Sequence, residues 1–323
     1  MPKTGDSVIA HLKGREKLLR PLGFTRQQAE WITLACLHSG LFTRDQAGAF
    51  LRLTRRTAQR FVQALLQARI SGRPVADAQT VDARRIYRIF GKAIYRELGL
   101  DNVRYRREAS IEVMRRRLLS LDFVVDHPDL SWLASEQEKV ACFEQLGIGR
   151  ELFPKRIYTG RANGRGHYFH FKMPLAVEQD RAVFTYIDPG IGTRTELDSW
   201  GTAHRRLWEK LRQSGCRVEV VAVAWEQHLL DRAERVLTSW RGRGITEAEQ
   251  EAAMLRQAIA DTDFEIIERH GGFDAVVNRV LQVEEQSAST NGPGMIDGFH
   301  LWGSLRCRRM GVPLSEGGGD IEG

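Results

Sequence analysis

Residues 25–68 read TRQQAEWITLACLHSGLFTRDQAGAFLRLTRRTAQRFVQALLQA, and helix-start signals recur in this segment at short intervals. Three runs with apolar residues at helical spacing each follow a threonine that can cap a helix, namely Thr25, Thr43 and Thr54. The first two threonines are followed three residues later by a glutamine, which completes a capping box. The pattern predicts helices over residues 26–39, 44–51 and 55–68. The turn between the second and third helices has about three residues, which indicates a helix-turn-helix.

Two short strand-like runs follow the third helix, over residues 69–76 and 84–90. A β-hairpin placed directly after the third helix is typical of the wing of a winged helix-turn-helix. We therefore expect such a domain over residues 22–100, closed by a helix over 91–98. An N-terminal extension over residues 1–21 precedes it.

The remainder of the chain has the pattern of a second, α/β domain. Residues 101–150 form a helical connector, and strand candidates follow at 156–159, 167–173, 182–187 and 218–225. Because long helical patterns separate the last strands, the order predicts a mixed sheet with at least one crossover. We expect an α/β domain with a helical C-terminal extension over residues 151–286, with a helix break at Gly271-Gly272. Glycine, serine and proline then predict a flexible tail over residues 287–323.

Charge is distributed unevenly along the 323 residues. Residues 1–120 hold 24 Lys and Arg against 10 Asp and Glu, a net charge of +14, whereas residues 121–323 have a net charge of −7. This asymmetry indicates a polyanion partner for the first part alone. No run of 18 or more apolar residues occurs, and the first residues lack an apolar signal core, so we expect a cytoplasmic protein with no membrane partner. The four cysteines are too far apart for a zinc or redox motif.

The third predicted helix carries hydrogen-bond donors near its N-terminal end, where a recognition helix meets base edges and phosphates. The candidate DNA contacts there are Thr54, Arg55, Arg56, Thr57, Gln59 and Arg60. In the wing they are Arg73, Arg84 and Arg85, which we expect to contact flanking phosphates. A solvated basic face that binds nothing is the alternative interpretation of these residues.

The predicted α/β domain also has the outline of a restriction endonuclease. Asp188 and Glu196 would be metal ligands there, with Lys172 stabilising developing charge. No Asp/Glu-x-Lys motif follows Asp188, however, since Pro189-Gly190 occupies those positions. We therefore expect an incomplete active site, with no catalytic residue, metal or cofactor.

The winged helix, the segment Arg85-Ile86-Tyr87-Arg88-Ile89-Phe90-Gly91-Lys92 that leaves the wing, and a basic helix before an α/β domain resemble the replication-relaxation family. The resemblance covers about residues 25–240. The chain has Ile89-Phe90-Gly91 where the family usually has Leu-Thr-x-x-Gly. Members are DNA-binding proteins of plasmids, phages and integrative elements, so the resemblance implies a role in maintaining or replicating mobile-element DNA.

The sequence thus predicts a non-catalytic, double-stranded DNA-binding protein of a mobile genetic element. It would be a regulator or accessory factor in replication, transfer, recombination or transcription. We expect a homodimer, in which the α/β domain mediates dimerisation or recruits a partner protein. The alternative is a metal-dependent nuclease or nickase that the winged helix targets to DNA.

Overall fold

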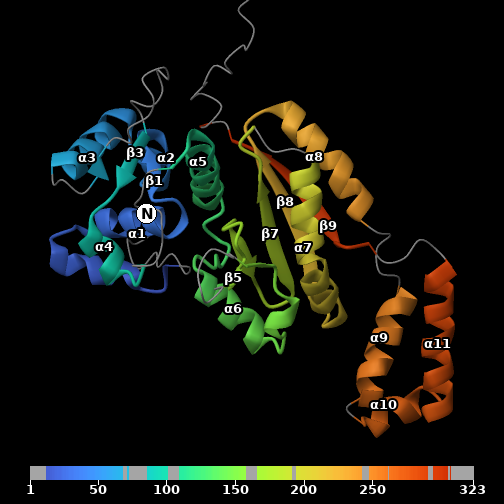
Figure 1. Ribbon diagram of the computed structural model, residues 1–323. Helices are drawn as coiled ribbons and strands as arrows, with labels where there is room; N and C mark the ends of the chain where they lie inside the picture. The colour runs from blue at the N-terminus through green and yellow to red at the C-terminus, as the bar shows by residue number, and fades with distance from the viewer. Residues whose placement is uncertain are drawn as a thin grey trace, which may run out of the picture.

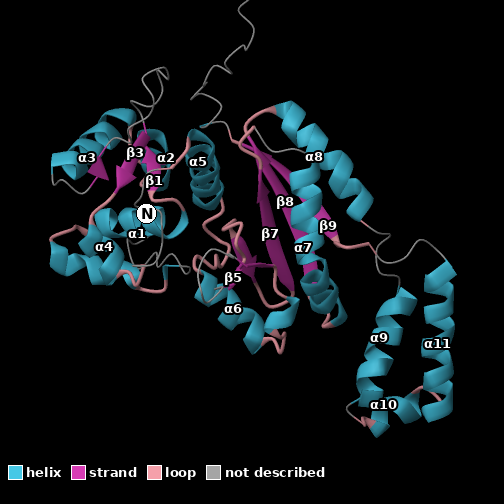
Figure 2. Cartoon of the chain, viewed as in Figure 1, coloured by secondary structure: helices cyan, strands magenta, loops and turns pink. Residues whose placement is uncertain are grey.

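A computed structural model of the chain describes residues 12–67, 71–72, 86–100, 109–157, 166–190, 194–241, 247–260, 262–289, 294–304 and 306. It combines helices with a mixed sheet (Figures 1 and 2). None of the helices in these ranges is both long and apolar enough to cross a membrane.

The N-terminal part begins with the predicted helices. Its elements are the 3-10 helix η2 (Arg15–Leu22), α1 (Arg26–His38), β1 (Leu41–Thr43), α2 (Arg44–Phe50), α3 (Arg55–Gln67), β2 (Ser71–Gly72), β3 (Ile86–Ile89) and α4 (Lys92–Glu97). Both predicted capping boxes form: Thr25 and Thr43 accept hydrogen bonds from backbone N–H groups, and each threonine N–H donates to the paired glutamine side chain over 3.0 Å. Because these bonds satisfy N–H groups that the helix leaves free, they fix where α1 and α2 begin.

Strand β1 was not predicted from the sequence. Residues Leu41–Thr43 are all buried, and β3 lies between β1 and β2 in an antiparallel sheet. Phe42 faces Tyr87 across the strands, and their rings stack with centroids 5.4 Å apart. A strand of three buried residues has no visible alternation, and only its pairing with distant β3 stabilises it. The predicted hairpin turn lies outside the described ranges, together with residues 69–70, 73–76 and 84–85 of the runs that flank it.

A four-stranded mixed sheet forms the centre of the second part. Its order is β6 (Leu175–Val177), β7 (Arg181–Ile187), β8 (Arg217–Ala224) and β9 (Gly298–Gly303). β6 is antiparallel to β7, and the other pairs are parallel. Helices α7 (Arg194–Gln213) and α8 (Gln227–Trp240) cover one face, whereas α5 (Ile111–Asp126) lies on the other (Figure 1). This arrangement confirms the expected mixed sheet.

The predicted strand over residues 167–173 is shorter in the structure. It ends at Tyr168 as β5 (Gly166–Tyr168), which pairs with β4 (Lys155–Ile157) in a separate hairpin beside α6 (Glu136–Gln145) and the 3-10 helix η5 (Arg150–Leu152). Phe169 and Lys172 then adopt φ angles of 48° and 54°, and the Phe169 N–H donates to Pro154 O over 2.8 Å. The run therefore continues through a tight turn, in which Phe169 is buried and Lys172 is exposed, and not through a strand.

The prediction of a flexible tail over residues 287–323 is wrong for residues 298–303. These residues form β9, which pairs in parallel with β8 from Glu219↔Gly298 to Ala224↔Gly303. The composition around the strand is typical of a loop, but the ladder partner supplies the hydrogen bonds that a short isolated strand lacks.

The helical extension that ends before this strand is present as predicted. It consists of α9 (Glu247–Ala260), α10 (Phe264–Arg269) and α11 (Phe273–Ser289). Gly271 and Gly272, at the predicted break, both have φ angles of 90°. Residues with a Cβ rarely adopt this backbone conformation, which explains the glycine pair.

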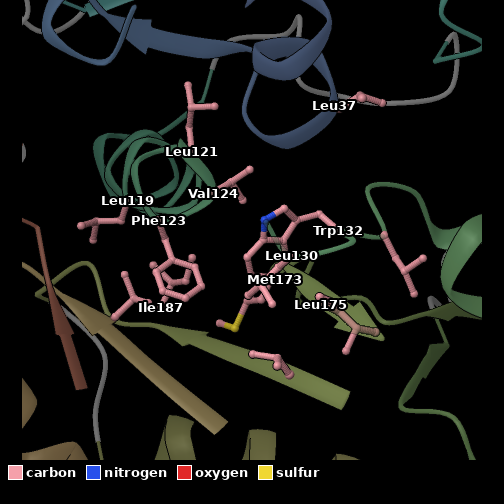
Figure 3. Close-up of a cluster of buried hydrophobic side chains, with 14 of the residues drawn as sticks. Leu37, Leu119, Leu121, Phe123, Val124, Leu130, Trp132, Met173, Leu175 and Ile187 are labelled. Carbon is pink, nitrogen blue, oxygen red and sulfur yellow. The ribbon is translucent and has the colours of Figure 1, made fainter. Parts of the chain in front are cut away.

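Helix α5 joins the two parts through its packing. One side contacts α1, α2 and β1, and the other contacts β7 and β8. Gln46 donates from its Nε2 to Leu118 O over 2.8 Å, which ties α2 to this helix. Leu119 and Phe123 lie on the side of α5 that faces the strands (Figure 3). The connector expected over residues 101–150 therefore contains a core helix, and one continuous hydrophobic cluster includes residues from both parts.

Candidate nucleic-acid interface

Helix α3 has one buried side and one exposed side. Ala58, Val62 and Leu65 are buried at helical spacing, and the helix packs on α2. The opposite side exposes Thr54, Arg55, Arg56, Thr57 and Arg60. The core contacts of Ala58, Val62 and Leu65 thus determine which of the predicted DNA-contacting residues face solvent.

Two threonines organise the start of α3. Thr54 accepts a hydrogen bond from the backbone N–H of Thr57 over 3.4 Å, and the two hydroxyl oxygens lie 3.0 Å apart. The predicted cap is therefore present. A helix N-terminus with nearby hydroxyl groups favours phosphate oxygens, because its free N–H groups carry partial positive charge.

The exposed arginines on α3 are uncompensated among the described residues. No carboxylate in the described ranges forms an ion pair with Arg55, Arg56 or Arg60. Elsewhere on the protein many arginines have an acidic partner, as Arg26 does in Glu30 at 2.8 Å. Three guanidinium groups without a described acidic partner therefore lie on one exposed side of the helix. We call Thr54, Arg55, Arg56, Thr57 and Arg60 the α3 face.

Gln59 differs from its neighbours because it is half-buried. Its Oε1 accepts a hydrogen bond from Arg44 of α2 over 3.4 Å, and Arg44 also pairs with Asp45 at 2.9 Å. Sequence reasoning missed Arg44, whose only signal is its place directly after the Thr43 cap. The predicted wing contacts Arg73, Arg84 and Arg85 lie outside the described residues.

The residues of the alternative nuclease site are placed differently. Asp188 directly follows β7 and is only 4% exposed. It forms an ion pair with Arg232 of α8, and its Oδ1 accepts a hydrogen bond from the Gly190 N–H over 2.9 Å. Glu196 of α7 pairs with Arg116 of α5 at 2.7 Å. Burial raises the pKa of the Tyr186 phenol, and the negative charges of Glu196 and Asp188 raise it further.

Lys172, the third residue of that set, lies elsewhere. It lines a small cavity with Lys139, Thr185 and His204, whose lining includes neither Asp188 nor Glu196. Lys139 is buried there, where it donates to Met173 O over 2.7 Å, and burial lowers its pKa to about 8. Within the described part of the chain, no group of three or more His, Cys, Asp and Glu side chains could hold a metal ion. Both carboxylates therefore act on Tyr186, but each has a guanidinium partner, and Lys172 lines a cavity that includes neither of them.

Comparisons with known proteins found no match among family models, curated proteins or solved structures.

Proposed function

We propose that the protein binds double-stranded DNA through the α3 face and that the sheet β1-β3-β2 belongs to a winged helix. The supporting observation is the set of exposed arginines on α3 that lack described acidic partners. Arginine can contact guanine through two hydrogen bonds, and phosphate oxygens through its charge. The net charge of +14 in residues 1–120 supports a polyanionic ligand for this part of the chain.

The order of elements favours duplex DNA over other polyanions. Helices α1 to α3 lead into a strand that returns beside β1, which is the order of a helix-turn-helix with a wing. In this arrangement α3 enters the major groove, and wing residues contact flanking phosphates. The α/β part then mediates dimerisation or recruits a partner protein. The resemblance to replication-relaxation proteins supports a role as a regulator or accessory factor of a mobile genetic element.

Duplex binding is expected to weaken steeply with salt. Each phosphate that an arginine neutralises releases counterions, so the logarithm of the binding constant should fall linearly with the logarithm of salt concentration, with a slope of about −0.9 per contact. Fluorescence anisotropy of a labelled duplex, titrated with the full chain at several salt concentrations, measures this slope. Affinity that does not change with salt would exclude a charge-led interface.

A second candidate function, metal-dependent DNA cleavage, rests on Asp188 and Glu196 at the carboxyl edge of the sheet. The ion pairs with Arg232 and Arg116 speak against it, because a guanidinium partner competes with a metal ion for the carboxylate oxygens. We expect supercoiled plasmid to remain uncut after incubation with the protein and Mg²⁺ or Mn²⁺. Gel electrophoresis shows the outcome. Cleavage that Asp188→Ala abolishes would establish the nuclease instead.

A further inference from the structure

Helices α9 to α11 form an insertion between α8 and β9 of the sheet domain. The chain leaves after α8 and returns before β9 at the same place, since Met295 N–H donates to Trp240 O over 2.8 Å and Arg241 bridges to Ile296. The three helices have their own small hydrophobic cluster, which includes Ala252, Leu255, Ile267, Val276 and Val280. Since α8 already makes the crossover from β8 to β9, the insertion is not needed to connect these strands. We call residues 247–289 the helical arm.

The helical arm is strongly acidic. It contains ten Asp and Glu residues against three Lys and Arg, a net charge of −7. This equals the net charge of the whole chain from residue 121 onward, so the rest of that part is neutral. Two of the three arginines are already paired inside the arm, Arg279 with Glu251 at 2.9 Å and Arg269 with Glu265 at 2.8 Å. Among the described acidic residues of the arm, Glu268 and Asp274 are exposed and neither pairs with these two arginines.

The tip of the helical arm adds two exposed aromatic side chains. Phe264 begins α10 and is 69% exposed, and Phe273 begins α11 and is 55% exposed. An acidic residue directly follows each phenylalanine in the sequence, Glu265 and Asp274. Exposed phenylalanines gain free energy when a partner covers them, and aromatic residues are frequent anchors of protein interfaces. A partner of this tip should therefore offer cationic groups beside apolar surface.

The chain itself carries a cationic surface. The α3 face has three arginines without an acidic partner among the described residues, and Phe90 (42%) and Leu22 (42%) are exposed on other segments of the same N-terminal part. The arm projects beyond α7 and α8, with the sheet and α5 between it and α3 (Figure 1). The arm therefore lies away from the α3 face of its own chain. A second copy presents that face without any rearrangement.

We infer that the tip of the helical arm binds the α3 face of a second copy of this chain. Each copy offers one arm and one α3 face, and a two-fold dimer satisfies both through two reciprocal contacts. The arm then occupies the same arginines that bind DNA, and dimerisation competes with duplex binding. Only this competition rests on the proposed function. The association itself is independent of DNA.

The first test measures self-association of the full chain without DNA, by analytical ultracentrifugation at low salt. We expect a reversible dimer. Its dissociation constant should rise at least about tenfold in Phe264→Ser/Phe273→Ser, and likewise in Glu268→Lys/Asp274→Lys. Two exposed residues outside the arm serve as matched controls: Leu146→Ser and Glu209→Lys should dimerise as the parent protein does. Circular dichroism confirms that each variant is folded.

The second test identifies the partner surface by charge exchange. Arg56→Glu/Arg60→Glu should lose self-association but should associate with Glu268→Lys/Asp274→Lys when the two variants are mixed, because opposite charges again face each other. A monomer at every concentration of the parent protein would overturn the inference. So would a dimer that the arm variants leave unchanged, or a mixture of the two variants that stays monomeric.

Adding duplex DNA separates this inference from the proposed function. If both hold, DNA dissociates the parent dimer, and the arm variants bind DNA at least as tightly as the parent protein. If the dimer forms as described but no duplex binds, the proposed function fails while the contact stands. If the duplex binds, but the arm variants have the same molecular mass in solution and the same DNA affinity as the parent protein, the proposed contact is wrong and the proposed function stands.

Discussion

Replacing Arg56 and Arg60 together by alanine is expected to weaken duplex binding by about 1–3 kcal/mol for each arginine that contacts a base edge. Both side chains are exposed, and neither has a described acidic partner. The substitutions should therefore leave the fold intact, because Ala58, Val62 and Leu65 hold α3 in place. The measurement is anisotropy with a duplex selected from random sequences, at one fixed salt concentration.

A matched control removes the same charge elsewhere. Arg206→Ala/Arg235→Ala takes two exposed arginines from α7 and α8, and we expect it to keep duplex affinity close to that of the parent protein. The conservative variant Arg56→Lys/Arg60→Lys keeps the charge but loses the two-pronged geometry of the guanidinium. It should bind DNA with reduced preference for the selected site. Equal losses in the α7/α8 control and the α3 variant would show that α3 has no special role.

The free energy of unfolding is expected to fall by about 2 kcal/mol between pH 7 and pH 5 because of His204. Burial lowers the pKa of this histidine to about 3, from 6.5. Its ring lies among Trp200, Phe184 and Trp208, and its Nδ1 donates to Trp200 O over 2.7 Å, so the neutral form fits the fold. The unfolded chain takes up a proton below pH 6.5 while the folded chain does not. The stabilisation is therefore complete above pH 6.5 and is lost as the pH falls toward 3.

Urea unfolding followed by circular dichroism at several pH values measures this dependence. His204→Phe keeps an aromatic ring in the cluster but has no group to titrate, so its stability should change little between pH 7 and pH 5. Burial also lowers the pKa of His170, and this residue should account for the small slope that remains. If the free energy of unfolding of His204→Phe falls with pH as steeply as that of the wild-type protein, another group is responsible.

Local signals in the sequence were sufficient for the helices around the candidate site. A capping threonine, a glutamine three residues later and an apolar stripe are all contained within a few residues. They placed the starts of α1 and α2 and the exposed arginines Arg55, Arg56 and Arg60 of α3 correctly, whereas Gln59, expected to be exposed, is half-buried. The charge asymmetry is likewise a property of the sequence itself. The same locality explains the correct helix break at Gly271-Gly272.

The errors occur where stability comes from distant partners. β1 is held by β3, and β9 is held by β8 from a segment whose composition indicates a loop. The roles of the acidic residues changed for a similar reason. In the sequence Asp188 and Glu196 are two carboxylates near a strand end, whereas in the fold Arg232 and Arg116 neutralise them from other helices. No spacing in the sequence relates these four residues.

The sequence by itself therefore determined where the helices around the candidate site begin and where positive charge gathers, because these depend on neighbours along the chain. Which side of α3 is buried was decided by its packing, which covers Ala58, Val62 and Leu65 and leaves Ala64 exposed. Tertiary structure decided that α5 is shared by both parts, that Lys172 lies away from Asp188, and that the acidic arm projects on the side opposite α3 (Figure 1). The physical reason is that strand pairing, burial and ion pairs between elements depend on contacts between residues far apart in the chain.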